Sequence, residues 1–112
     1  MNDTVILVTS PGMGRGPEDL QKTLIAKYLE LLGQYDDLPI AICFYNEGVK
    51  LVTEGSPVLE LLHTLEAKGV RLVICSTCLN YFNLQEKVAA GVVGGMGDIL
   101  EAQLRAGKVI TL

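Results

Sequence analysis

The fold class is decided by the stretch Val5-Ile6-Leu7-Val8 and by the loop that follows it, Ser10-Pro11-Gly12-Met13-Gly14-Arg15-Gly16. An unbroken apolar run rich in β-branched residues is typical of a strand buried on both faces of a parallel sheet. Pro17 then suits the first position of a helix, and Glu18 and Asp19 are favourable in its first turn. The stretch therefore predicts a strand, a tight turn and a helix, in that order.

The same alternation continues to the carboxyl terminus. We predict further strands at residues 40–45, 70–74, 88–93 and 109–112, and helices at residues 17–32, 57–68, 78–82 and 98–106. Ser56 is the expected N-cap of the second helix, and residues 46–48 are expected to form a turn. Regular alternation of this kind implies parallel strands joined by right-handed crossovers. The sequence therefore predicts one domain (residues 1–112), a flavodoxin-like α/β three-layer sandwich of about five mostly parallel strands with helices on both faces.

The first predicted helix carries an apolar surface wider than a sheet alone would cover, for which a stripe of about 100° suffices. The apolar residues are Leu20, Leu24, Tyr28 and Leu31 on one stripe, with Ile25, Leu29 and Leu32 beside it. A neighbouring helix and a subunit interface explain the excess equally well.

Composition and charge exclude several classes of function. The 112 residues hold 9 Lys and Arg against 13 Asp and Glu, a net charge of -4, whereas nucleic-acid binding needs a basic excess. The longest apolar run, residues 40–45, is far shorter than the roughly 20 residues of a membrane-spanning helix. Because the first residues also lack the pattern of a signal peptide, we expect a cytoplasmic protein that binds neither nucleic acid nor membrane.

The cysteines point to the candidate site. Ligands of an open parallel sheet bind beyond the carboxyl ends of the strands, where residues 10–16, 46–48, 75–78 and 94–97 are predicted to gather. Two of the three cysteines lie there, in Cys75-Ser76-Thr77-Cys78, whereas Cys43 lies inside a predicted strand and is expected to pack in the core.

We place the chemistry on Cys78. A thiol at a helix N-terminus meets unpaired N–H groups and the positive end of the dipole, which lower its pKa to about 3.5–7.5, against about 8.5 for free cysteine. Such a thiolate could attack sulfane sulfur or a disulfide. Cys75, at the end of the strand, is better placed to support Cys78 or to resolve the intermediate that forms on it. The alternative is that both cysteines are small buried hydrophobes.

Other interpretations of the pair are weaker. One CxxC supplies two of the four ligands of a structural zinc site, and only Cys43 and His63 remain, so we expect no metal and no cofactor. A thioredoxin-type redox pair needs a proline later in the chain that packs beside it, and no proline follows Pro57. A reversible disulfide between Cys75 and Cys78 stays open.

The glycine-rich loop at residues 12–16 invites a nucleotide-binding interpretation, with Glu47 as a ribose-binding acid. Its spacing is GxGxG rather than GxGxxG, and it lacks the Lys-Ser/Thr of a phosphate-binding loop, so the signal is weak. Arg15 is the more interesting residue, as a cation that could hold a thiolate or a small anion, although an exposed loop charge is the simpler explanation.

Six strings of the sequence form a recognisable set in order and spacing. They are Gly14-Arg15-Gly16, Leu38-Pro39, Asn46-Glu47-Gly48-Val49-Lys50-Leu51, Thr53-Glu54-Gly55-Ser56, Cys75-Ser76-Thr77-Cys78-Leu79-Asn80-Tyr81 and Lys108-Val109-Ile110. The chain thereby resembles the DsrE/DsrF-like family, and within it the carboxyl-terminal domain of YedF-type, sulfurtransferase-like proteins linked with selenium metabolism.

The resemblance implies an oligomeric α/β protein in a sulfur relay. The family cysteine, which accepts sulfur as a persulfide and passes it on, falls on Cys78, and Cys75 is the companion found in the YedF-like branch. The TusA-like domain that usually precedes this one is not expected here, so a donor or acceptor such as a TusA-like carrier would act in trans. Ser76, Thr77, Arg15 and Asn46 are the candidate substrate-binding residues.

Two hypotheses for function follow. The first is a sulfur- or selenium-handling carrier, or a sulfurtransferase-like protein, that uses a Cys78 persulfide with help from Cys75. The second is a non-catalytic, oligomeric binding module, or a thiol-redox protein using the CxxC pair.

Overall fold

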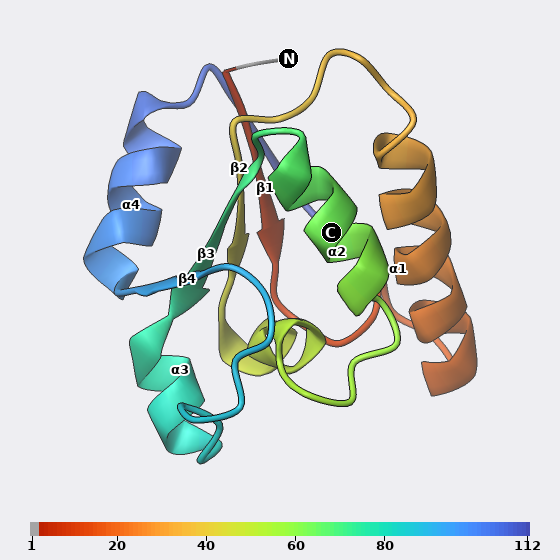
Figure 1. Ribbon diagram of the computed structural model, residues 1–112, viewed down its shortest axis with the longest axis vertical. Helices are drawn as coiled ribbons and strands as arrows, with labels where there is room; N and C mark the ends of the chain where they lie inside the picture. The colour runs from red at the N-terminus through yellow and green to blue at the C-terminus, as the bar shows by residue number, and fades with distance from the viewer. Residues whose placement is uncertain (1–2) are drawn as a thin grey trace.

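A single parallel sheet runs through the computed structural model, and helices cover both of its faces (Figure 1). The structure describes residues 3–112. The elements are β1 (Thr4–Val8), α1 (Glu18–Leu32), β2 (Ala41–Phe44), the 3-10 helix η1 (Asn46–Val52), α2 (Leu59–Ala67), β3 (Arg71–Cys75), α3 (Ser76–Tyr81), β4 (Val92–Gly94), α4 (Met96–Arg105) and β5 (Lys108–Thr111).

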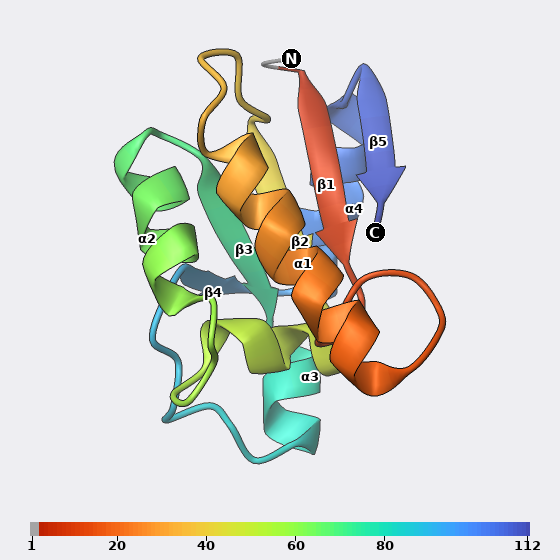
Figure 2. The ribbon, with the colours of Figure 1, turned by 90° about the vertical axis from the view of Figure 1, so that its right-hand side faces the viewer.

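The sheet has the order β4-β3-β2-β1-β5, and every neighbouring pair is parallel. The predicted α/β sandwich is confirmed, with a strand order that differs from the 2-1-3-4-5 order of flavodoxin itself. The chain steps outward from β1 to β4 and then returns across the whole sheet to β5. Right-handed crossovers therefore place α1 and α2 on one face and α4 on the other, as the views in Figures 1 and 2 show.

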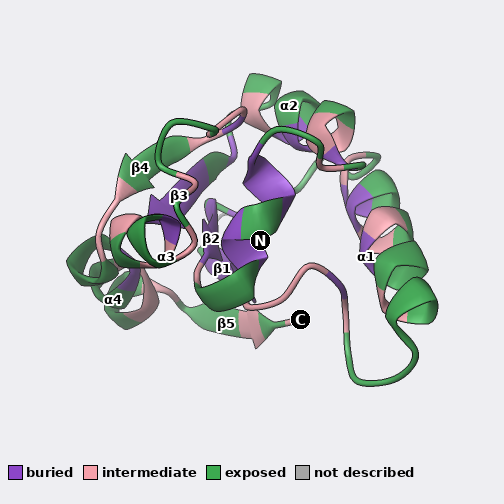
Figure 3. Ribbon diagram, turned by 90° about the horizontal axis from the view of Figure 1, so that it is seen from below, coloured by how far each residue is buried: buried purple, intermediate pink, exposed green. Residues whose placement is uncertain are grey.

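Alternation along the buried strands divides the core into two clusters. The larger lies under α1 and α2 and contains Ile6, Val8, Ile42, Phe44, Leu72 and Ile74 from the strands. The smaller lies under α4 and contains Val5, Leu7, Ala41, Cys43, Val73 and Cys75. Figure 3 shows this burial concentrated on β1, β2 and β3. Both sheet faces are thus apolar, as expected for a parallel sheet.

The segment after β2 is the largest departure from the predicted elements. Instead of a simple turn at residues 46–48, the chain forms the 3-10 helix η1 over Asn46–Val52. Val49, Leu51 and Val52 of η1 are buried in the larger cluster, so η1 is part of the core rather than a surface loop.

Three further predictions were wrong in detail. Helix α2 begins at Leu59 rather than Pro57, because residues 57 and 58 form a turn in which the Ser56 hydroxyl accepts a hydrogen bond from the Val58 N–H. Helix α3 begins at Ser76 rather than Cys78. Strand β4 covers only Val92–Gly94, because Gly91 has a left-handed backbone (φ 81°) that interrupts the predicted strand.

The wide apolar surface of α1 is only half covered. Ile25, Leu29 and Leu32 are buried, whereas Leu20, Leu24 and Leu31 remain between 43% and 50% exposed despite the neighbouring α2. A second uncovered stripe runs along α4, at Met96, Leu100 and Leu104. Within residues 3–112, no helix is long and apolar enough to cross a membrane.

The turn at Gly91 yields the first testable prediction. A Cβ added to Gly91 would lie 2.9 Å from the Leu72 carbonyl oxygen, on a backbone that L side chains rarely adopt. We expect Gly91→Ala to lower the free energy of unfolding by about 1–3 kcal/mol in urea denaturation. The matched control is Gly97→Ala, where a Cβ meets nothing within 4 Å and α4 should gain about 0.5–1 kcal/mol. Equal stability of the two variants would contradict this prediction.

Candidate functional site

The candidate site lies where β2 and β3 end side by side. Cys75 is the last residue of β3, and α3 starts immediately after it, so Cys78 is the third residue of that helix. Tyr45 follows β2, and Asn46 begins η1. Helices η1 and α3 pack against each other, which brings Asn46 and Cys78 together across 32 residues of sequence.

One hydrogen bond defines the geometry of the site. The backbone N–H of Asn46 donates to the Sγ atom of Cys78 over 3.0 Å. Asn46 has a left-handed backbone (φ 53°), and its Oδ1 atom accepts a hydrogen bond of 2.9 Å from the Glu47 N–H. Asparagine tolerates this backbone better than most residues because its side chain bonds locally. The turn thus aims a backbone donor at the sulfur.

Gly48 explains how η1 can lie so close to the sheet. A Cβ at Gly48 would overlap the Val8 carbonyl oxygen at the end of β1. That same oxygen accepts a hydrogen bond of 3.1 Å from the Tyr45 N–H, and the Tyr45 carbonyl in turn accepts one of 3.0 Å from the Gly48 N–H. The Asn46 turn is therefore fixed to β1 by backbone contacts.

Cys78 lines a pocket of about 590 Å³. Its lining residues are Tyr45, Asn46, Glu47, Thr77, Cys78, Tyr81, Phe82 and Met96. The Tyr81 and Phe82 rings meet edge to face, 5.0 Å apart between centroids. Lys50 lies 4.7 Å from the Phe82 ring centroid and forms an ion pair of 3.1 Å with Glu47. The sulfur thus faces an aromatic pocket with a charged pair nearby.

The pKa of Cys78 departs from our expectation. Burial of the thiol raises its pKa above the ordinary value, the hydrogen bond from the Asn46 N–H opposes that shift, and the neighbouring Cys75 side chain adds to it. The prediction of a lowered pKa was wrong because the helix-terminus argument ignored burial. Helix α3 is also short, with six residues, so its dipole lowers the pKa too little to offset the effect of burial.

The other two cysteines are fully buried. Cys75 is the N-cap of α3, lies in the cluster on the α4 face of the sheet, and contributes to the raised pKa of Cys78. Cys43 lies inside β2, as predicted, and burial raises its pKa to about 11. All three cysteines are free thiols.

The structure brings some predicted site residues together and not others. Asn46 and Thr77 line the Cys78 pocket, whereas Ser76 and Arg15 are not among its lining residues. Arg15 is exposed on the loop after β1. Sequence reasoning missed Tyr45, Tyr81, Phe82 and Met96. Their positions directly after β2, in and after α3, and at the start of α4 were the available signal.

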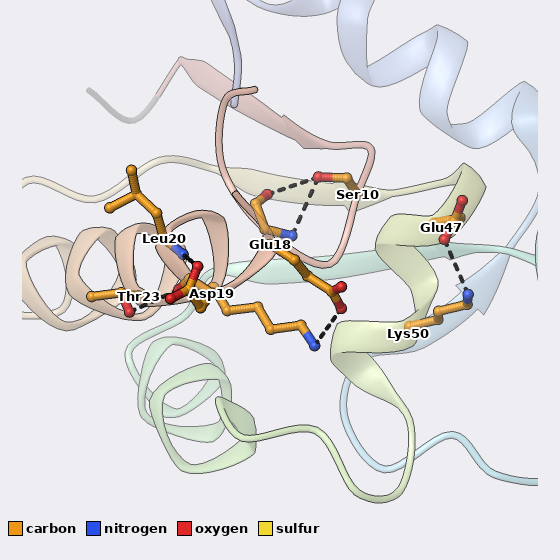
Figure 4. A network of polar contacts seen from close by, with 9 residues as sticks. Ser10, Glu18, Asp19, Leu20, Thr23, Glu47 and Lys50 are labelled. Carbon is orange, nitrogen blue, oxygen red and sulfur yellow. Dashed lines mark hydrogen bonds and ion pairs between the residues drawn. The ribbon is translucent and has the colours of Figure 1, made fainter. Parts of the chain in front are cut away.

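The glycine-rich loop does not form a phosphate cradle. Ser10 closes the loop by bonding both to the carbonyl and to the N–H of Gly12 (Figure 4). The adjoining pocket, of about 400 Å³, is lined by the carboxylates of Glu18 and Glu47. The one lysine that lines it, Lys22, pairs with Glu18 at 2.9 Å, so the local charge disfavours a nucleotide phosphate.

Metal-ligand side chains do not cluster in the part of the chain that the structure describes. No group of three or more His, Cys, Asp or Glu residues within residues 3–112 could hold a metal ion. The Nε2 atom of His63 lies 2.8 Å from the Ala89 carbonyl oxygen, so this exposed histidine helps to hold the loop before β4.

The fold and site define an α/β protein with a thiol at the carboxyl edge of its sheet. The model of the DsrE/DsrF-like family matches residues 3–112, and the chain belongs to this family, which is often linked with sulfur relay. No curated protein matches the sequence.

Solved structures share the fold at low sequence identity. The ychN protein of E. coli is 21% identical with a TM-score of 0.71, covering 97% of this chain and 98% of its own. A protein of unknown function from Methanobacterium thermoautotrophicum is 21% identical with a TM-score of 0.69, covering 97% of each chain. A third, from Bacteroides thetaiotaomicron, is 19% identical with a TM-score of 0.67, covering 99% and 96%.

The burial of Cys78 predicts its pH dependence. Because a raised pKa keeps the thiol protonated at neutral pH, its alkylation by iodoacetamide should accelerate as pH rises, with a midpoint above that of a cysteine peptide. Peptide mass spectrometry isolates Cys78, since Cys43 and Cys75 are fully buried. A midpoint below the peptide value would contradict the account.

The close approach of Gly48 to Val8 predicts that a side chain at position 48 would also disturb the hydrogen bond to Cys78. We expect Gly48→Ala to push η1 away from Val8, weaken the bond from the Asn46 N–H to Cys78, and raise the pKa of Cys78 further. The same alkylation profile measures the shift. Gly55→Ala, where a Cβ meets nothing within 4 Å, is the control for the strain of a glycine replacement alone. An unchanged profile in Gly48→Ala would show that η1 does not depend on this approach.

Proposed function

We propose that Cys78 accepts sulfane sulfur as a persulfide and carries it within a sulfur relay. The observation that supports this most is the backbone N–H of Asn46 directed at the Cys78 sulfur, on the rim of an aromatic pocket. A hydrogen bond to sulfur stabilises the anionic form. A persulfide is a stronger acid than its parent thiol, so the same donor suits the loaded state better than the resting thiol.

The loading step transfers one sulfur atom. Cys78 attacks the outer sulfur of a donor persulfide, a new S–S bond forms on Cys78, and the donor leaves as a thiol. The raised pKa of Cys78 means that its proton is still present at neutral pH. That proton passes to the departing donor thiolate, which completes the balance without an added base. The same exchange would serve selenium.

The donor and acceptor act in trans in this proposal, with a TusA-like carrier as the partner type. The rim supports the docking of a protein thiol, because Tyr81 is 78% exposed and Met96 is 48% exposed beside Cys78. Exposed aromatic and thioether side chains of this kind are enriched where proteins meet. Glu47 and Lys50 add a charged pair that can orient the approaching partner.

A second candidate function is an oligomeric binding module without chemistry at Cys78. The exposed leucines of α1 and α4 favour it, since two apolar stripes on opposite faces of the sheet are suited to self-association. The protonated resting thiol favours it as well. Self-association is compatible with both candidate functions, whereas sulfur loading of Cys78 is expected only for the sulfur carrier.

Sulfur loading separates the two candidates. The protein is incubated with a cysteine desulfurase and labelled cysteine, and thiol-labile label is then mapped by peptide mass spectrometry. The test uses Cys75→Ala, in which no second thiol can displace the sulfur bound to Cys78. We expect label on Cys78 in Cys75→Ala and in Cys43→Ala/Cys75→Ala, and none in Cys75→Ala/Cys78→Ser. If Cys75→Ala and Cys75→Ala/Cys78→Ser were equally unlabelled, the carrier function would be excluded and the binding module favoured.

A further inference from the structure

We propose that Cys75 resolves the loaded state, so that the protein releases sulfur as sulfide and forms a disulfide between Cys75 and Cys78. This inference rests on the proposed function, because it needs a persulfide on Cys78. With this step the protein can reduce the bound sulfane sulfur to sulfide, in addition to transferring it to an acceptor. The feature that carries it is the second thiol lying directly behind the first.

The positions of the two cysteines suit an attack of one on the other. Cys75 is the N-cap of α3 and Cys78 is the third residue of the helix, so one helical turn separates them and their side chains share a face. Cys75 is buried in the cluster under α4, and Cys78 packs against that same cluster. Two cysteines three residues apart at the start of a helix are the arrangement of Cys-X-X-Cys redox motifs, which cycle between dithiol and disulfide.

The burial of the two thiols differs, which assigns their roles. Cys75 is 0% exposed, whereas Cys78 is only partly buried and lines the pocket. A donor in solution can reach Cys78 and not Cys75. Cys75 therefore reacts only with sulfur that Cys78 already carries, which is the division between an entry thiol and a resolving thiol.

The step balances without an added oxidant. The Cys75 sulfur attacks the Cys78 Sγ atom, the bond between Cys78 and the outer sulfur breaks, and the S–S bond of the disulfide forms. The outer sulfur leaves with the Cys75 proton as hydrogen sulfide, so it is reduced while the two thiols are oxidised. Hydrosulfide is a weaker base than an alkyl thiolate and leaves more readily. A dithiol reductant then attacks the exposed Cys78 sulfur and restores both thiols.

The test loads reduced protein with inorganic polysulfide, removes the excess by desalting, and follows both sulfide release and intact mass. We expect the wild type to release one equivalent of sulfide and to end with the mass of an internal disulfide. Peptide mapping should place that disulfide between Cys75 and Cys78. Cys43→Ala is the matched control and should behave as the wild type does.

The variants at Cys75 separate this inference from the proposed function. Cys75→Ala should retain one added sulfur atom on Cys78 and release no sulfide. Cys75→Ser provides a second readout if the alanine variant folds poorly. A wild type that keeps its added sulfur as long as Cys75→Ala would overturn the resolving role and leave the carrier intact. If neither Cys75 variant retained sulfur on Cys78, the carrier function itself would fail.

Discussion

The hydrogen bond from the Asn46 backbone to the Cys78 sulfur depends on how closely η1 approaches the end of β1. Only a residue without a side chain fits against the Val8 carbonyl, and Gly48 supplies it. That approach fixes the turn at Asn46, the turn aims its N–H at the sulfur, and α3 carries the sulfur to the same point. The site is therefore a product of sheet topology, since β2 and β3 must be parallel neighbours for their ends to meet.

Two opposing effects set the state of the thiol. Burial disfavours the thiolate, and the backbone donor favours it; in the resting protein burial prevails. A thiol of this kind stays protonated at neutral pH, and because the thiolate is the nucleophile it reacts more slowly than a thiol of lowered pKa. A docked donor whose leaving thiolate takes the proton changes that balance. Cys75 is buried next to Cys78 in the sequence motif, and solvent does not reach it. In the proposed mechanism, Cys75 therefore reacts only with sulfur that Cys78 already carries.

Much of the fold could be predicted from sequence because its signals are local. Unbroken apolar runs mark strands buried on both faces, and helical spacing marks α1 and α2. η1 could not be predicted in this way, since its buried Val49, Leu51 and Val52 lie in a segment too short to show a period. Cys78 stood out as a candidate through the CxxC and its place after a strand. Its true partner, a backbone N–H, leaves no trace in the sequence beyond the left-handed preference of Asn46, and burial, which decides the pKa, depends on packing between distant segments.

The central claim is that the Asn46 N–H responds to the charge on the Cys78 sulfur. The most direct measurement is the amide chemical shift of Asn46 by nuclear magnetic resonance, followed across pH in the wild type and, after sulfur loading, in Cys75→Ala. The account predicts that the Asn46 amide titrates with the midpoint of Cys78, shifts again in the loaded protein, and loses both responses in Cys78→Ser. An Asn46 amide that stays silent while Cys78 titrates or takes up sulfur would contradict it.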